Sequence, residues 1–366
     1  MFIGSVLSFP EWVSSAPKVY LGYVSMIIVS SAFFVSTYVV CRYRKSLHWG
    51  LLAMAVSPVI FFAAFIPRWQ NFFIRYTRLI GAQDDPNITA SFIATSLLIA
   101  SVFYLYKKSR LRWLGGLCIF LSMPLFLWAG SRGAMLSVAI VLISLSALYF
   151  SQGPSWKRIG AVFTLFCIFI LSISVAITVL PEPTKVLLYQ KSIKPILPNQ
   201  GLSEFVLKNW ILEGDDEFYA DAILRNVSAE TFSISRGNLW SLAFKEIVKS
   251  PFGFGPAYHN WHPIQYGKGA HNLWLQIPLT VGWGGFLAWF IFIGAIFRSA
   301  IQILKKEDFA GMALSAAFLF FLVSGIFIDI LTLRQLWLVM GMIVGYASLQ
   351  KINEEKSNVL DATPNP

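Results

Sequence analysis

Gly269-Ala270-His271-Asn272 opens a stretch that continues as LWLQIPLTVGWGGFLAWFIFIGAIF from Leu273 to Phe297. No charged residue occurs between His271 and Phe297. At ~1.5 Å per residue, a continuous helix of this length would be longer than the ~30 Å hydrocarbon core of a bilayer. The stretch therefore predicts a membrane helix with one end outside the hydrocarbon region.

Pro278 indicates which end protrudes. Proline is best tolerated in the first turn of a helix and kinks the helix elsewhere, and the segment from Pro278 to Phe297 is by itself about long enough to span. We therefore expect the spanning segment to begin at Pro278. His271 would then lie roughly two turns further out, near the lipid headgroups. A titratable imidazole at the depth of lipid phosphates is a candidate catalytic group.

The composition predicts an all-α polytopic membrane protein. Hydrophobic residues make up 56% of the 366 residues and charged residues only 13%, which excludes a soluble globular domain. The formal net charge is +11, but the basic residues occur in short clusters between apolar runs, where they set topology. Membrane lipids, and not nucleic acid, are therefore the expected anionic partner.

About nine apolar runs are long enough to cross a membrane. In chain order they cover residues 19–40, 48–67, 88–106, 113–129, 133–150, 159–180, 271–297, 309–328 and 335–349. Lysine and arginine are concentrated in alternate loops, such as residues 42–45 and 107–112. The positive-inside rule assigns these loops to the cytoplasm, so we expect the N-terminus outside and the C-terminus inside.

This topology divides the chain into four parts. Residues 1–180 form an N-terminal bundle of six spans, and residues 181–270 form a long outer loop that contains short amphipathic helices. Residues 271–349 form a C-terminal bundle of three spans, and residues 350–366 form a cytoplasmic tail. One loop helix is expected to follow Ser235, a suitable N-cap, because apolar residues then recur at helical spacing up to Pro251.

Two arginines on the predicted outer side are candidate anion-binding residues. Arg236 falls in the first turn of the loop helix, beside backbone N–H groups that favour a bound anion. Ser131, Arg132 and Gly133 form the expected tight turn between two apolar spans. An arginine there is costly unless it finds a partner or a polar cavity, which favours a functional role for Arg132 over lipid-phosphate snorkelling.

The motifs together resemble the O-antigen ligase and polymerase superfamily. The first is Ser131-Arg132-Gly133-Ala134 in an apolar hairpin, and the second is Arg236 and Trp240 before Pro251-Phe252-Gly253-Phe254-Gly255. The third is His271-Asn272 followed by Gly282-Trp283-Gly284-Gly285. Their order and their predicted sides of the membrane are also similar to that family.

The resemblance implies a bacterial inner-membrane enzyme whose active site faces the periplasm. Such an enzyme transfers a polysaccharide from an undecaprenyl pyrophosphate carrier to an acceptor, without metal or other cofactor. The acceptor would be lipid A core in a ligase and a growing glycan in a polymerase; we favour the ligase. His271 would be the catalytic histidine, and Arg132 and Arg236 would hold the pyrophosphate, with Asn272 as a further substrate contact.

The residue chemistry agrees with these roles. Arginine forks bind phosphate oxygens bidentately and remain charged, and an imidazole with an ordinary pKa of ~6.5 suits general-base work on an acceptor hydroxyl. Three outer-loop arginines are further candidates for donor or acceptor phosphates, although anchoring at the membrane surface explains them equally well. These are Arg68, Arg75 and Arg78.

Other functions remain open at this point. His259 and His262 could join His271 at a metal, but their spacing matches no recognised zinc pattern. A transporter of lipid-linked solutes would be expected to carry ionisable residues near the membrane midplane, and the predicted span interiors lack them. A non-catalytic scaffold would need neither Arg132 nor His271.

Overall fold

In a computed structural model, the described part of the chain is helical apart from one very short hairpin. The structure describes residues 17–65, 73–74, 78–79, 86–106, 110–153, 155–179, 236–255, 272–306, 308–328 and 333–362. The predicted all-α fold class is confirmed for this part of the chain.

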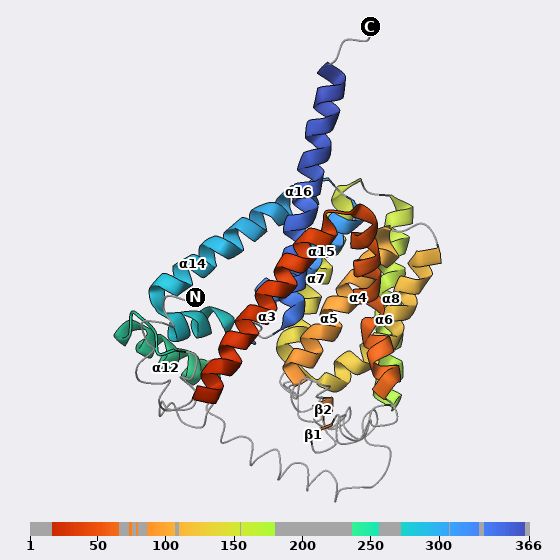
Figure 1. The fold of residues 1–366 in the computed structure, drawn as a ribbon. Helices are drawn as coiled ribbons and strands as arrows, with labels where there is room; N and C mark the ends of the chain where they lie inside the picture. The colour runs from red at the N-terminus through yellow and green to blue at the C-terminus, as the bar shows by residue number, and fades with distance from the viewer. Residues whose placement is uncertain are drawn as a thin grey trace, which may run out of the picture. The chain divides into compact units, whose positions relative to one another are not determined.

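Figure 1 shows the elements, which follow the predicted apolar runs closely. The N-terminal helices are α3 (Pro17–Cys41), α4 (Arg44–Phe65), α5 (Pro86–Tyr106), α6 (Arg110–Ala129), α7 (Arg132–Ser151) and α8 (Trp156–Val179). The later helices are α12 (Arg236–Lys249), α14 (Leu273–Leu304), α15 (Phe309–Ser324) and α16 (Arg334–Ala362). Between α4 and α5, β1 (Phe73–Ile74) pairs antiparallel with β2 (Arg78–Leu79).

Five of the described helices are long and apolar enough to cross a membrane, namely α5, α6, α7, α8 and α14. Three shorter apolar stretches lie in α3, α4 and α15. The molecule is therefore a multi-pass membrane protein, and the count of about nine spans remains a prediction. The predicted tail is largely helical, because α16 continues without interruption to Ala362.

The chain folds into two compact units. One contains Met1–Leu51 and Ser235–Pro366, and the other contains Leu52–Ile234. The second unit is built around α5, which is buried along almost its whole length. Several of its buried hydroxyls bond within the helix: Thr95 Oγ1 donates to Ser91 O (2.8 Å) and Ser101 Oγ to Leu97 O (2.8 Å). Such bonds let polar residues occupy a membrane helix without unsatisfied groups.

In the first unit, two glycines allow α3 and α16 to pack closely. A Cβ atom added at Gly341 would lie 2.5 Å from Phe34 O, and one added at Gly345 would lie 2.6 Å from Tyr38 O. Small residues four apart are a common device for bringing membrane helices into contact. The two glycines lie four residues apart in the sequence as well.

Two predicted boundaries were wrong. Pro278 lies inside the first segment of α14, and the helix is interrupted at Gly282 (φ 68°, ψ −175°). The uninterrupted helix from Trp283 to Leu304 is then ~33 Å long, enough to span. Arg132 is the first residue of α7 and not part of the turn, because Ser131 is the N-cap.

Candidate functional site

Asn272 caps the N-terminus of α14. Its backbone is extended (φ −147°, ψ 116°), and its Oδ1 accepts hydrogen bonds from the N–H groups of Trp274 (2.9 Å) and Leu275 (3.3 Å). The side chain thereby satisfies two of the N–H groups that a helix start leaves without partners. The capping bonds hold in place the residue that directly follows His271, while His271 itself lies outside the described residues.

The start of α14 is also tied to the end of α15. The N–H of Leu273 donates to the carbonyl of Gly325 (2.7 Å), and Gly325 is the C-cap of α15. The bond joins a helix N-terminus, which has N–H groups without acceptors, to a helix C-terminus, which has carbonyl groups without donors. The backbone beside His271 is therefore held from two directions.

A buried polar stripe runs along the first segment of α14. Asn272, Gln276 and Thr280 recur at a spacing of four residues and are 7%, 6% and 4% exposed. Gln276 Nε2 donates to Thr280 Oγ1 (3.2 Å), which donates to the carbonyl of Gln276 (2.7 Å). In the sequence, Gln276 and Thr280 fall within a predicted apolar span. Their four-residue spacing from Asn272 was the available signal.

The segment that follows α12 forms hydrogen bonds with the backbone groups at the interruption of α14. The N–H groups of Phe254 and Gly255 donate to the carbonyls of Leu279 (2.7 Å) and Thr280 (3.0 Å), and the N–H of Trp283 donates to Pro251 O (2.9 Å). Irregular backbone in a membrane protein persists only where protein groups satisfy it. We call this arrangement, residues 251–255 with residues 279–283, the backbone clamp.

Gly253 and Gly282 meet at the centre of the backbone clamp. Both have a positive φ, 77° and 68° respectively. A Cβ at Gly282 would lie 2.4 Å from Pro251 O, and a Cβ at Gly253 would lie 2.5 Å from the backbone nitrogen of Gly282. No L-residue with a side chain fits either position without moving backbone. The glycines of the Pro251–Gly255 and Gly282–Gly285 motifs therefore form one structural feature.

Helix α12 packs on the first segment of α14 next to the clamp. Ala243 and Ile247 form a buried cluster with Leu279, and Phe254 and Leu275 pack against it. Helix α12 and the first segment of α14 both have their C-terminal end at the clamp, so the N-terminus of each is the end farther from the clamp. Arg236 is the first residue of α12, as predicted to within one turn, and its side chain lies outside the description.

Arg132 occupies the equivalent position in α7, within the other compact unit. It is the first residue of the helix and is exposed, and Ser131 Oγ accepts from the N–H of Ala134 (3.5 Å) as N-cap. Arg132 and Arg236 therefore share one backbone position, the first residue of a helix. Such a terminus favours anions, because its N–H groups and dipole carry positive charge.

The remaining predicted residues are described only in part. Arg68 and Arg75 lie outside the described residues, as do His259 and His262. Arg78 lies in β2, paired with Ile74, and its side chain is likewise outside the description. In the described ranges, no group of three or more His, Cys, Asp or Glu side chains is arranged to hold a metal ion.

Replacing Asn272 tests the cap. Asn272→Ala is expected to destabilise the protein by ~1 kcal/mol, because it removes the acceptor for two N–H groups. Asn272→Asp keeps the acceptor and should retain most of the stability. Thermal unfolding of the purified protein measures both, with exposed Asn353→Ala in α16 as control. An equal loss for alanine and aspartate would contradict the capping role.

The fold and these features define a multi-pass membrane protein with a clamped, polar helix start and two arginines at helix N-termini. The family model described as O-antigen ligase matches residues 117–290, a stretch that contains Arg132, Arg236, His271 and the clamp. This match supports the resemblance to the O-antigen ligase and polymerase superfamily that the sequence motifs indicate. No curated protein and no solved structure matches the chain.

Proposed function

We propose that this protein transfers a polysaccharide from an undecaprenyl pyrophosphate carrier to an acceptor hydroxyl on lipid A core. The reaction takes place at the periplasmic face of the bacterial inner membrane and uses no metal. The observation that carries the proposal is the start of α14 directly after His271, which Asn272 caps and the Leu273–Gly325 hydrogen bond holds, inside the family match. A polymerase that joins repeat units to a growing glycan is the alternative.

His271 is the proposed general base. The acceptor oxygen forms a bond to the anomeric carbon of the donor sugar, and the bond from that carbon to the pyrophosphate oxygen breaks. His271 takes the proton that the acceptor hydroxyl loses as it attacks. Undecaprenyl pyrophosphate leaves with the electron pair of the broken bond. The cap and the Leu273–Gly325 hydrogen bond support this role, because they fix the backbone next to the imidazole.

Arg132 and Arg236 are the proposed ligands of the pyrophosphate. Negative charge grows on the leaving group as the sugar–oxygen bond breaks, and fixed positive charge there lowers the barrier. Each arginine is the first residue of its helix, so backbone N–H groups can add to the guanidinium at one phosphate. The Nδ2 amide of Asn272 is a further proposed donor to substrate, since its cap uses only Oδ1. Arg68, Arg75 and Arg78 are proposed as outer-loop contacts for donor or acceptor phosphates.

Arginine variants test the pyrophosphate contacts. Arg132→Gln and Arg236→Gln are each expected to lower kcat/KM for the donor by about 10²- to 10³-fold, the usual effect of removing one oxyanion-stabilising donor. Lysine should restore only part of the activity, because it keeps the charge and loses the bidentate fork. Exposed Arg298→Gln, at the other end of α14, is the matched control. Wild-type kcat/KM in both glutamine variants would remove these residues from the mechanism.

The acceptor is tested by the product. Purified protein in proteoliposomes receives a labelled undecaprenyl pyrophosphate oligosaccharide and lipid A core, with EDTA present throughout. Label on lipid A core identifies a ligase, and a ladder of longer glycans on the carrier identifies a polymerase. A parallel reaction without EDTA serves as comparison, and product that forms only there would contradict the metal-independent mechanism. With intact donor and no product of either kind, the proposed function fails.

A further inference from the structure

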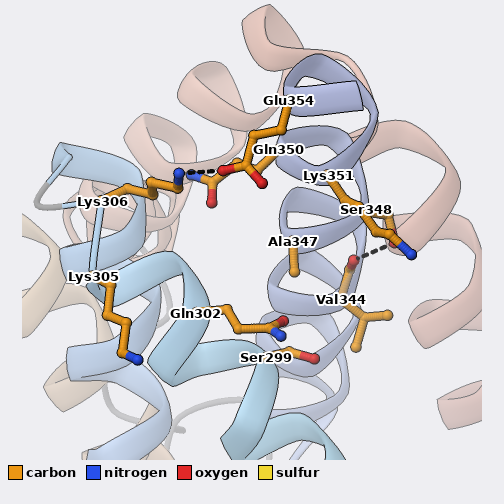
Figure 2. A pocket seen from close by; sticks show the side chains of 10 residues that line it. All are labelled: Ser299, Gln302, Lys305, Lys306, Val344, Ala347, Ser348, Gln350, Lys351 and Glu354. Carbon is orange, nitrogen blue, oxygen red and sulfur yellow. Dashed lines mark hydrogen bonds and ion pairs between the residues drawn. The ribbon is translucent and has the colours of Figure 1, made fainter. Parts of the chain in front are cut away.

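A polar groove lies between α14 and α16, at the end of α14 opposite His271. It has a volume of about 460 Å³. Its lining residues are Ser299, Gln302, Lys305, Lys306, Val344, Ala347, Ser348, Gln350, Lys351 and Glu354. Figure 2 shows the Lys306–Glu354 ion pair crossing between the two helices at one end of the groove, with Gln302 and Ala347 between them. None of the catalytic residues proposed above lines this groove.

The lining carries an excess of positive charge. Three lysines face one carboxylate, Glu354, and that carboxylate is already paired with Lys306. Lys351 is only loosely paired, 3.9 Å from Glu355 on the solvent-exposed part of α16. The Lys305 ammonium has no ion-pair partner among the described residues. Among the described residues, Lys305 is therefore left for an anionic ligand, Lys351 is held only in a weak, exposed pair, and Gln302 and Ser299 add neutral hydrogen-bonding groups.

An exposed apolar stripe on α14 leads to the groove. Phe290, Phe297 and Ile301 are 59%, 47% and 39% exposed, and the spacing from Phe290 through Phe297 and Ile301 to Lys305 keeps them on one helix face. Gly294 lies between them and has open space beside it. Exposed apolar surface on a membrane helix is the surface that acyl chains cover. The ligand should therefore carry a phosphate and acyl chains together.

We propose that this groove binds the phosphate headgroup of an anionic phospholipid, with the acyl chains along the apolar stripe of α14. The headgroup lies at the depth where α14 leaves the membrane, which the predicted topology assigns to the cytoplasmic leaflet. Basic pockets between helices on that side suit anionic headgroups, since each nearby lysine contributes favourably. Lys305 contacts the phosphate from α14, Lys351 adds positive charge from α16, and the Lys306–Glu354 pair closes one end of the groove.

Lipid binding to the purified full-length protein tests the proposal. Native mass spectrometry or a fluorescence titration gives the Kd for phosphatidylglycerol, for phosphatidylcholine with the same chains, and for glycerol phosphate without chains. Phosphatidylglycerol should bind at least tenfold more tightly than the other two. The double variant Lys305→Gln/Lys351→Gln should weaken phosphatidylglycerol binding by about 30-fold, roughly fivefold for each lysine.

A matched control separates the groove from general surface charge. Lys157→Gln/Lys356→Gln removes the same charge at exposed positions outside the groove and should leave the Kd unchanged. Glu354→Gln should tighten phosphatidylglycerol binding, a gain that a folding defect cannot produce. An unchanged Kd in the groove variant, or an equal loss in the control, would overturn the proposal. Equal binding of glycerol phosphate would replace the lipid by a soluble phosphate and overturn it as well.

Discussion

Replacing His271 with alanine is expected to abolish glycan transfer while leaving the donor bound. The imidazole takes the acceptor proton in the proposed mechanism, and removal of a general base typically lowers the rate by 10²- to 10⁴-fold. In the same proposal Arg132 and Arg236 hold the donor, so donor binding should change little. The measurements are kcat with excess donor and acceptor in proteoliposomes, and the donor Kd for the same preparation.

His48 provides the matched histidine control. It lies in α4 and stacks on Phe309, with ring centroids 5.8 Å apart and an interplanar angle of 28°. His48→Ala removes an imidazole from the end of the molecule that the topology assigns to the cytoplasm, and transfer should continue. If His271→Ala keeps at least a tenth of the wild-type kcat, a general-base role for His271 is excluded.

Replacing Gly282 with alanine is expected to break the backbone clamp. The added Cβ would lie 2.4 Å from Pro251 O, so residues 251–255 must move away and leave the carbonyls of Leu279 and Thr280 without donors. Two lost buried hydrogen bonds and a left-handed alanine together cost about 4 kcal/mol. We expect the thermal midpoint of the purified protein to fall by roughly 10 °C, with loss of transfer activity.

A substitution at Gly284 tests whether the loss of stability and activity expected for Gly282→Ala comes from the broken clamp. It is two residues away in the same helix, and a Cβ there would meet no atom within 4 Å. Gly284→Ala should therefore leave the midpoint and the activity close to wild type, whereas Gly253→Ala should resemble Gly282→Ala. Similar midpoints for Gly282→Ala and Gly284→Ala would show that the clamp contributes little to stability.

Helix positions and helix ends that depend on neighbouring residues could be predicted from the sequence. The apolar runs gave helix positions to within a few residues, and Ser235 and Pro251 bounded α12 closely. These features depend on neighbouring residues, through hydrophobic periodicity, capping and proline. The interruption of α14 depends instead on hydrogen bonds from residues 251–255. The sequence pattern therefore predicted the helix boundary at Pro278. In the structure the interruption lies at Gly282, where residues 251–255 supply hydrogen bonds.

Sequence patterns single out the charged residues of the candidate site, but not the uncharged residues that hold the backbone beside it. Arg132 and Arg236 attract attention because charge is rare in this chain, and both begin helices. Gln276 and Thr280 are uncharged and sit in an apolar run, so nothing local distinguished them from the span. Asn272 was expected to contact substrate. Its capping role is visible only from its extended backbone conformation in the structure.

The most direct test of the central claim is the fate of the carrier lipid. Wild-type proteoliposomes with labelled donor, acceptor and EDTA should release one undecaprenyl pyrophosphate for each glycan transferred, and His271→Ala should release none. That result requires the bond between sugar and pyrophosphate to break at this protein. Donor that crosses the vesicle membrane with its glycan still attached, and no free carrier in the wild type, would contradict the account and indicate transport.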